Sequence, residues 1–237
     1  MRDGPARRIA PKLFGSHGQR PWFQLGMTAL GEHLTFFRQA IRALREVGAL
    51  SATSQAVANT VVAPIAPKER PIRVLEVGAG TGAITQAILS RLSQGDHLDL
   101  YEINPAFAAV LRQTVGSVSG PMVKVYEADI ESVAHDVRYD FIVSSLPLLN
   151  LPPDKVDRIF VLLLSVLKPG GTLSYYDYWA KELRQFIHGT AERQRVREVL
   201  RVTRGYLQRY QYHHRVMFTN VPPASIHYLR TSPAASE

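Results

Sequence analysis

The sequence contains no cysteine, and none of its apolar segments is long. Without cysteine the chain forms no disulfide and has no thiolate to act as a nucleophile or as a metal ligand. The longest apolar segment, residues 159–167, has about half of the ~18 residues that span a membrane. The N-terminal residues also lack the apolar core of a signal peptide. We therefore expect residues 159–167 to form a buried helix and the protein to be cytoplasmic.

Motifs for metal ions and nucleic acids are missing as well. The histidines show no ligand spacing with carboxylates, and the adjacent His213 and His214 face opposite sides if they lie on a strand. No helix-turn-helix, zinc-finger or RNA-recognition signature is present. The sequence therefore predicts no metal site and no specific nucleic acid partner.

Positive charge, by contrast, is abundant. The formal net charge is +8. Six arginines gather in one segment near the C-terminus: Arg193, Arg195, Arg197, Arg201, Arg204 and Arg209. Such an excess attracts RNA, DNA or an anionic membrane alike, so charge by itself leaves these partners open.

The clearest motif is a glycine-rich loop between an apolar strand and a helix, within residues 74–85. Gly78, Gly80 and Gly82 permit backbone torsions and a close ligand approach that a Cβ atom would prevent. The spacing G-x-G-x-G lacks the last interval of the dinucleotide fingerprint. Glu76, two positions before the first glycine, repels a pyrophosphate and favours a cationic ligand. The pattern predicts a cofactor loop, but not one for NAD.

A second carboxylate, Glu102, ends the next apolar segment about twenty residues later. This placement lets an acidic side chain hold both hydroxyls of a ribose. Glu76 and Glu102 together suit an adenosine that carries an amino acid. With Asp129 after the third strand, the E-x-G-x-G-x-G motif resembles the class I S-adenosylmethionine (SAM) methyltransferases. The resemblance implies SAM as cofactor, bound by Glu76, Gly78, Gly80, Thr81, Gly82, Glu102, Ile103, Asp129, Ile130 and Ser144.

Strands and helices are predicted to alternate along most of the chain. Strands are expected at residues 72–77, 97–102, 123–127, 140–145 and 171–178, helices at 83–92, 105–115, 154–167 and 181–210, and a closing hairpin at 214–219 and 225–229. This order predicts an α/β, Rossmann-like methyltransferase fold with a seven-stranded, mostly parallel sheet and a C-terminal antiparallel hairpin. We expect an N-terminal helical extension at residues 1–65 and the SAM-binding domain at 66–237.

The N-terminal extension contains a basic amphipathic helix at residues 30–47. One apolar stripe is formed by Leu30, Leu34, Phe37, Ile41 and Leu44. Such a helix either packs against its own domain or lies in a membrane interface, with its arginines near anionic head groups. We favour a lid at the membrane interface, which would bind an anionic membrane surface.

The loop after the fourth strand, residues 144–152, is expected to lie beside the transferable methyl group. It has serines and a leucine where the adenine-N6 methyltransferases place an Asn or Asp, two prolines and an aromatic residue. Its S-S-L-P-L pattern resembles the bacterial phospholipid N-methyltransferases, which methylate phosphatidylethanolamine. Residues 47–54 and 220–226 are similar to two further motifs of that family.

Methylation of an amine requires the neutral amine, so the site must help an ammonium lose a proton. Tyr176, Asp177, Tyr178 and Ser145 are the candidate catalytic residues. The tyrosines can stabilise a cationic head group by cation–π attraction, and Asp177 can accept a proton. Alternatively, the tyrosines simply cover the sheet, since tyrosine favours strands.

These observations predict a peripheral membrane SAM-dependent N-methyltransferase on the cytoplasmic face of the membrane. The expected substrate is phosphatidylethanolamine, converted to its mono-, di- or trimethylated forms on the route to phosphatidylcholine, or a related amino-lipid such as ornithine lipid. Two alternatives remain. An rRNA adenine N6-dimethyltransferase-like enzyme requires a base-stacking aromatic residue in the loop at 144–148, and a non-catalytic SAM-fold membrane-binding module predicts a damaged cofactor loop.

Overall fold

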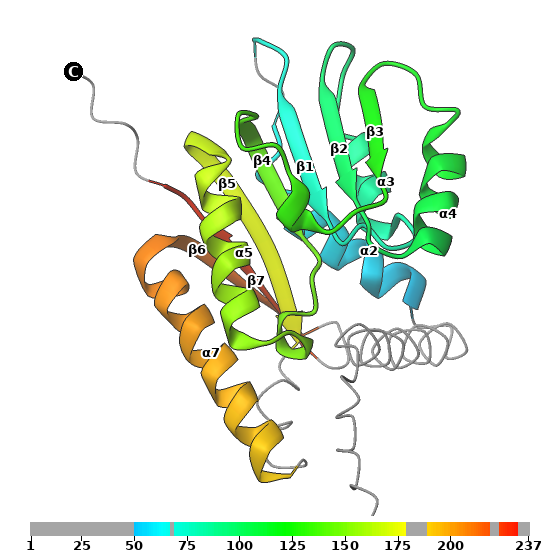
Figure 1. Cartoon of the computed structure of the whole chain (residues 1–237). Coiled ribbons are helices and arrows are strands. Elements are labelled where there is room, and N and C mark those ends of the chain that lie inside the picture. The colour runs from blue at the N-terminus through cyan, green and yellow to red at the C-terminus, as the bar shows by residue number, and fades with distance from the viewer. Residues whose placement is uncertain (1–49, 67–68, 179–188, 219–222, 232–237) are drawn as a thin grey trace, which may run out of the picture. The chain divides into compact units, whose positions relative to one another are not determined.

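A computed structural model describes residues 50–66, 69–178, 189–218 and 223–231. Its centre is a seven-stranded sheet in the order β3-β2-β1-β4-β5-β7-β6 (Figure 1). The strands are β1 (Arg73–Val77), β2 (His97–Tyr101), β3 (Met122–Tyr126), β4 (Tyr139–Ser144), β5 (Leu167–Tyr178), β6 (Gln211–Met217) and β7 (Ala224–Leu229). Neighbours from β3 to β5 are parallel, and β7 is antiparallel to both β5 and β6. The predicted fold class is confirmed.

Helices cover both faces of the sheet. Those with described positions are α2 (Leu50–Val61), α3 (Ala83–Leu89), α4 (Pro105–Val115), α5 (Pro153–Ser165) and α7 (Thr190–Tyr210), with short 3-10 turns η1 (Ile130–Ser132) and η2 (Leu148–Asn150). One apolar core joins the sheet to α2, α3 and α4, and a second joins it to α5 and α7. Because both faces are covered, β4 is buried along its whole length, as expected of a central parallel strand.

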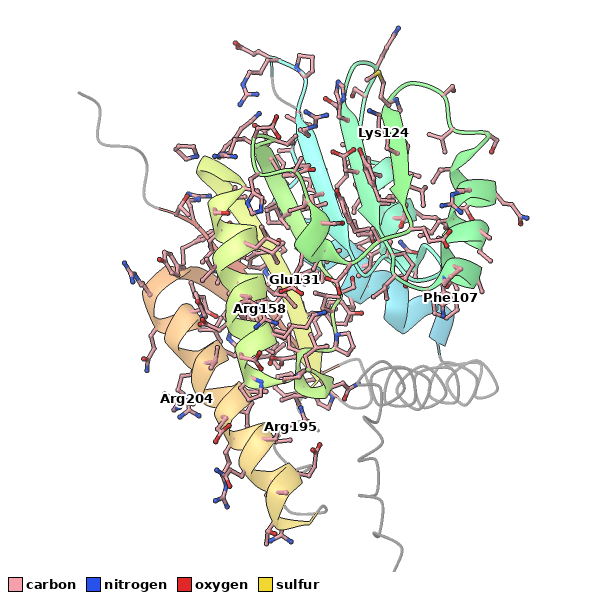
Figure 2. All side chains as sticks on the ribbon, viewed as in Figure 1. Phe107, Lys124, Glu131, Arg158, Arg195 and Arg204 are labelled. Carbon is pink, nitrogen blue, oxygen red and sulfur yellow. The ribbon has the colours of Figure 1, made fainter. Side chains whose placement is uncertain are left out.

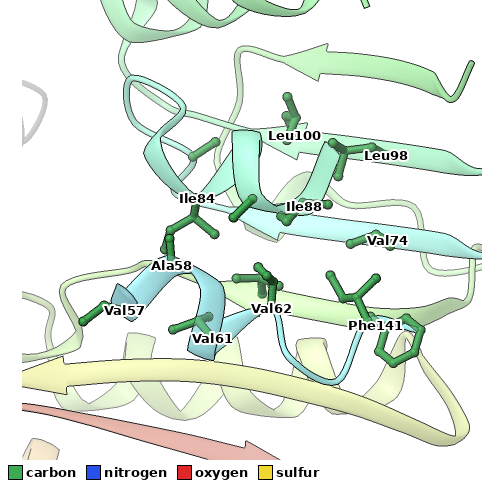
Figure 3. Packing of buried hydrophobic residues seen from close by; sticks show 14 of the residues in the cluster. Val57, Ala58, Val61, Val62, Val74, Ile84, Ile88, Leu98, Leu100 and Phe141 are labelled. Atoms are coloured by element: carbon green, nitrogen blue, oxygen red, sulfur yellow. The ribbon is translucent and has the colours of Figure 1, made fainter. Parts of the chain in front are cut away.

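The first core includes a helix that precedes the sheet in sequence. Val57, Ala58 and Val61 of α2 pack against Ile84 and Ile88 of α3 beside β1 and β4 (Figure 3). These side chains are at most 7% exposed. Residues from Val47 onward form one compact unit, so α2 is part of the unit that contains the sheet.

Residues 1–49, which include the amphipathic helix predicted at 30–47, lie outside the described residues. In the part of the chain that is described, no helix combines the length and hydropathy needed to cross a bilayer.

The predicted elements differ from the observed ones mainly at their ends. The predicted strands 72–77 and 97–102 match β1 and β2 within one residue at each end. Strand β5 starts earlier than expected, at Leu167, because this residue already pairs with Tyr139 of β4. A register shift follows, and Gly170 adopts a φ of 72° before regular pairing resumes at Thr172. The helix predicted at 181–210 is present as α7 from Thr190, and residues 181–188 lie outside the described part.

Candidate active site

The glycine-rich loop follows β1 at the carboxyl edge of the sheet. Gly78 has a φ of 72°, and a Cβ atom at this position would lie 3.1 Å from Cδ2 of Leu146. Any larger residue would therefore be strained and would also press on the loop that follows β4. The Gly78 amide donates to the carbonyl of Tyr101 at 2.9 Å, which ties the loop to the end of β2. Thr81 and Gly82 continue this loop into α3.

Glu76 is the most unusual charged residue in this region. Its side chain is fully buried, and one oxygen, Oε2, accepts a hydrogen bond from the Thr85 hydroxyl at 2.7 Å. The other oxygen, Oε1, is also buried and receives no hydrogen bond from the described residues. Burial raises the pKa of Glu76 from 4.5 to about 8, more than the Thr85 hydrogen bond lowers it. Burial thus favours the protonated form of Glu76. Once ionised, its carboxylate has a buried oxygen, Oε1, that can pair with a cationic or hydrogen-donating partner.

Glu102 lies at the end of the adjacent strand and is also buried. Its Oε2 accepts from the amide of Gly80 at 2.8 Å, and its Oε1 accepts from the amide of Asn104 at 2.7 Å. Each carboxylate oxygen has a further lone pair, so two more donors can bind. Glu102 thus joins the glycine-rich loop to the loop after β2. Ile103, the next residue, exposes 47% of its surface.

Asp129 follows β3 and caps η1. Its carboxylate accepts from the amide of Glu131 at 3.0 Å and from Nζ of Lys155 at 2.6 Å. Burial raises the pKa of Asp129, but these two hydrogen bonds outweigh it and the pKa is lowered overall. The Ile130 side chain is only 4% exposed and packs in the second core. Only the backbone of Ile130 therefore remains for contact with a ligand.

The loop after β4 lies next to the glycine-rich loop. Ser144 is buried at the end of β4, and the Ser145 amide donates to the carbonyl of Val77 at 2.8 Å. The Ser145 hydroxyl oxygen is buried and makes no hydrogen bond with any residue in the described ranges. Leu146 lies against Gly78, so close that a Cβ atom at residue 78 would come within 3.1 Å of its Cδ2. These contacts bring the two serines predicted for the site next to the glycine-rich loop.

Arg195 of α7 holds the far end of the same loop. It donates to the carbonyl of Leu151 through Nη1 at 2.7 Å and to the carbonyl of Leu149 through Nη2 at 2.6 Å. Glu192, one turn earlier in α7, pairs with the same guanidinium at 2.5 Å. Figure 2 shows Arg195 on the part of α7 nearest to this loop. In the sequence Arg195 is only one of several cations, because Leu149 and Leu151 are more than forty residues away.

The end of β5 contributes three tyrosines and one aspartate, at residues 175–178. Tyr175 faces α5 and α7, and its ring packs edge-on against Phe160. Tyr176 packs against the opposite core, and Asp177 returns to the face of Tyr175, as alternation along a strand requires. The Tyr178 side chain lies outside the described part.

His227 of β7, to which the sequence analysis gave no role, stacks on Tyr175 and lies 3.5 Å from Asp177. Only the register between β5 and β7 could have revealed this contact.

Comparisons with known proteins agree with this geometry. The family described as "Methyltransferase domain" matches residues 74–171. An ornithine lipid N-methyltransferase of Singulisphaera acidiphila is 30% identical over 134 residues, which are 54% of this chain and 68% of that protein. The chain belongs to the class I SAM-dependent methyltransferases. A malonyl-[acyl-carrier protein] O-methyltransferase of Ilyobacter polytropus is 30% identical over 120 residues, 49% of this methyltransferase but only 43% of that protein.

A solved structure shows the same fold. The N-methyltransferase NodS of Bradyrhizobium japonicum, in complex with S-adenosylhomocysteine, superposes on this methyltransferase with a TM-score of 0.57 and 15% identity. The alignment covers 77% of this methyltransferase and 90% of NodS. The cofactor of this methyltransferase is SAM.

The residues of this methyltransferase fit SAM. The free oxygen of Glu76 matches the need of an amino acid ammonium group for a buried carboxylate. Glu102 retains acceptor capacity for two hydroxyl groups, and the loop between them has no Cβ atom at Gly78 and Gly80. The individual roles of these residues, and of Thr81, Gly82, Ile103, Asp129, Ile130 and Ser144, remain predictions.

Proposed function

We propose that this methyltransferase methylates the primary amino group of a membrane amino-lipid. The observation that carries the proposal is the similarity to the ornithine lipid N-methyltransferase, which extends over 68% of that protein's length. Ornithine lipid and phosphatidylethanolamine share the required chemistry, a primary amine on a lipid head group. The S-S-L-P-L sequence at residues 144–148, which resembles the phospholipid N-methyltransferases, supports the same class of substrate.

In this proposal the residues at the carboxyl ends of β1, β2 and β3 hold the cofactor. Glu76 pairs with the ammonium of SAM, Glu102 binds the ribose hydroxyls, and Asp129 faces the adenine. SAM supplies a methyl group on a sulfonium, which is already a good leaving group. The protein therefore has to align the amine with the methyl group, exclude water and remove one proton from the amine.

The residues at the ends of β4 and β5 are assigned to the amine. Asp177 is assigned as the proton acceptor because of its place in the sheet. It lies two residues beyond Tyr175, which pairs with Ser144 at the end of β4, so it lies near the loop that is expected beside the methyl group. The Ser145 hydroxyl, buried beside the glycine-rich loop, can hydrogen-bond the incoming nitrogen. Tyr176 and Tyr178 are assigned to the head group, where an aromatic ring stabilises a cation by ~0.5–2 kcal/mol.

Membrane attachment is supported by the charge on α7. Arg193, Arg197, Arg201 and Arg204 are all exposed and recur every three or four residues, so they share one face of the helix. Arg204 in Figure 2 marks this face. Each cation near an anionic leaflet contributes about 1 kcal/mol. We propose that this face and the helix predicted at residues 30–47 attach the protein to the cytoplasmic surface of the membrane.

A lipid profile by mass spectrometry tests the proposal. The protein is expressed in a bacterial host that contains phosphatidylethanolamine but no methylated lipid, and in the same host made to produce ornithine lipid. A mass increase by one, two or three methyl groups identifies the substrate and counts the transfers. The matched control is Glu76→Gln, which removes the charge proposed to bind SAM. If neither host yields a methylated lipid while the purified protein binds SAM, the proposal is wrong, and methylation of added rRNA becomes the next assay.

A further inference from the structure

A buried polar cluster lies on the sheet face that α5 and α7 cover. It consists of Tyr175 and Asp177 of β5 and His227 of β7. His227 pairs with Tyr175 in the antiparallel ladder, and the two rings stack with centroids 4.8 Å apart. The side chains of His227 and Asp177 are 8% and 19% exposed, and His227 Nε2 lies 3.5 Å from Asp177 Oδ2. An imidazole and a carboxylate are thus held together away from bulk water.

Gln211 determines which nitrogen of His227 faces the carboxylate. The amide oxygen of Gln211 lies 2.7 Å from Nδ1 of His227. An amide oxygen only accepts hydrogen bonds, so Nδ1 carries the proton and donates it to Gln211. In the neutral ring Nε2 is then the unprotonated nitrogen, and it faces Asp177. Two acceptors cannot bond to each other, so this contact becomes a hydrogen bond only when a proton lies between them.

The cluster lies at the edge of the sheet where the amine is proposed to bind. Tyr175 pairs with Ser144, the last residue of β4, and Asp177 is two residues farther toward the carboxyl edge. His214 of β6 stacks on the other side of the His227 ring, with centroids 4.7 Å apart. Among the described residues, the neighbouring elements bring these titratable groups to this face: Tyr175 and Asp177 of β5, His214 of β6, and Tyr206 and Tyr210 of α7.

We propose that His227 is a positioning residue that pairs with Asp177 once a proton lies between them and so takes up, through Asp177, the proton that the substrate ammonium releases. The inference rests on the proposed amine substrate. One N–H bond of the ammonium breaks, and its electron pair stays on nitrogen for the attack on the methyl group. The proton passes to Oδ2 of Asp177 and on to Nε2 of His227, where the resulting imidazolium is paired with the carboxylate. Gln211 keeps its bond to Nδ1 throughout.

The activity test uses His227→Asn, which retains a donor toward Gln211 but has no basic nitrogen. The probe is a vesicle of phosphatidylethanolamine and phosphatidylglycerol, or of ornithine lipid and phosphatidylglycerol, whichever the wild type methylates. We expect kcat to fall about 10- to 100-fold at pH 7, less than the ~10²–10⁴-fold that a general base itself contributes, because Asp177 is still present. The loss should shrink toward pH 10, where an alkylamine is increasingly neutral in solution. His213→Asn, on the same pair of strands but stacked on Tyr228, should follow the wild-type profile at every pH.

Two results would overturn the inference. One is a pH profile of His227→Asn that runs parallel to that of the wild type, since a purely structural role predicts a constant loss. The other comes from long-range ¹⁵N–¹H spectra of the wild-type protein, which need no substrate. A neutral His227 that carries its proton on Nδ1 supports the inference, and a proton on Nε2 refutes it. If the wild type methylates neither vesicle, the proposed substrate fails, and the ¹⁵N spectra still decide the arrangement of the pair.

Discussion

Replacing Glu76 by Gln should stabilise the protein in the absence of SAM while weakening SAM binding. The raised pKa means that the folded state binds a proton at Glu76 more tightly than the unfolded state does, between the ordinary pKa of 4.5 and the folded value of about 8. Within this window the free energy of unfolding falls as the pH rises, by up to about 1.4 kcal/mol per unit. Gln at this position does not titrate, so the variant lacks this loss.

The magnitude can be measured as a difference between the two proteins. From pH 5.5 to pH 7.5 the stability advantage of Glu76→Gln should grow by about 2–3 kcal/mol, because all other titrations are common to both proteins and cancel. Urea unfolding followed by circular dichroism at pH 5.5, 6.5 and 7.5 gives this difference. The control is Glu127→Gln, since Glu127 is exposed and pairs with Arg112 at the surface. A stability difference that does not change with pH would refute the assignment of a buried, proton-binding Glu76.

The same carboxylate makes SAM binding depend on pH. If the ammonium of SAM pairs with ionised Glu76, binding must release the proton that Glu76 holds below pH 8. Calorimetric affinity should therefore fall by up to about tenfold per pH unit below 8 in the wild type. Glu76→Gln should bind SAM at least about tenfold more weakly and without this slope, given that hydrogen bonds to charged groups contribute ~1.5–3 kcal/mol. Unchanged affinity in the variant would contradict the proposed role.

Three further outcomes are expected. Arg195→Ala should raise the KM for the lipid while leaving calorimetric SAM affinity unchanged, because it frees two carbonyls of the loop after β4; unaltered kinetics would contradict this. The double substitution Arg197→Gln and Arg201→Gln should weaken binding to anionic vesicles about 30-fold in co-sedimentation, at about 1 kcal/mol per cation, and equal binding would exclude this face from membrane attachment. Asp140→Asn should destabilise the protein at pH 7 by roughly 2 kcal/mol in urea unfolding. Burial raises the pKa of Asp140, but hydrogen bonds from Lys168, the Arg73 amide and Arg70 lower it to about 2 overall. The stability difference between the wild type and Asp140→Asn should therefore vanish as the pH falls from 3.8 to 2.

Local sequence patterns were sufficient to predict where the glycine-rich loop, Glu76 and Glu102 lie in the fold. Glu76 is the penultimate residue of the short strand β1, the glycine-rich loop follows β1 directly, and Glu102 follows β2 directly. The chemistry of these residues depends on burial and on neighbours within the same motif, such as Thr85 for Glu76 and Gly80 for Glu102. A pattern that spans about thirty residues therefore contains most of the information.

The acceptor half could not be predicted in the same way. His227 meets Asp177 only because β7 pairs with β5 in one particular register, and Arg195 reaches the loop after β4 only because α7 docks beside α5. Neither arrangement leaves a periodic signal in the sequence. Residues 50–61, which form α2, were likewise assigned only to the extension at 1–65 and not predicted as a separate helix, because their place in the core depends on packing against α3 and β7.

The division of the site along the chain has a consequence for recombination. Residues proposed for the cofactor precede residue 145, whereas Asp177, Arg195 and His227 all follow residue 171, where the matched family segment ends. A single crossover at this point would exchange Asp177, Arg195 and His227 while leaving the SAM residues, Ser145 and the loop after β4 in place. Gly171 itself must be retained at the junction, because a Cβ atom there would lie 2.9 Å from the Asp140 carbonyl oxygen. Shuffling libraries built on this scaffold should therefore be joined immediately after Gly171.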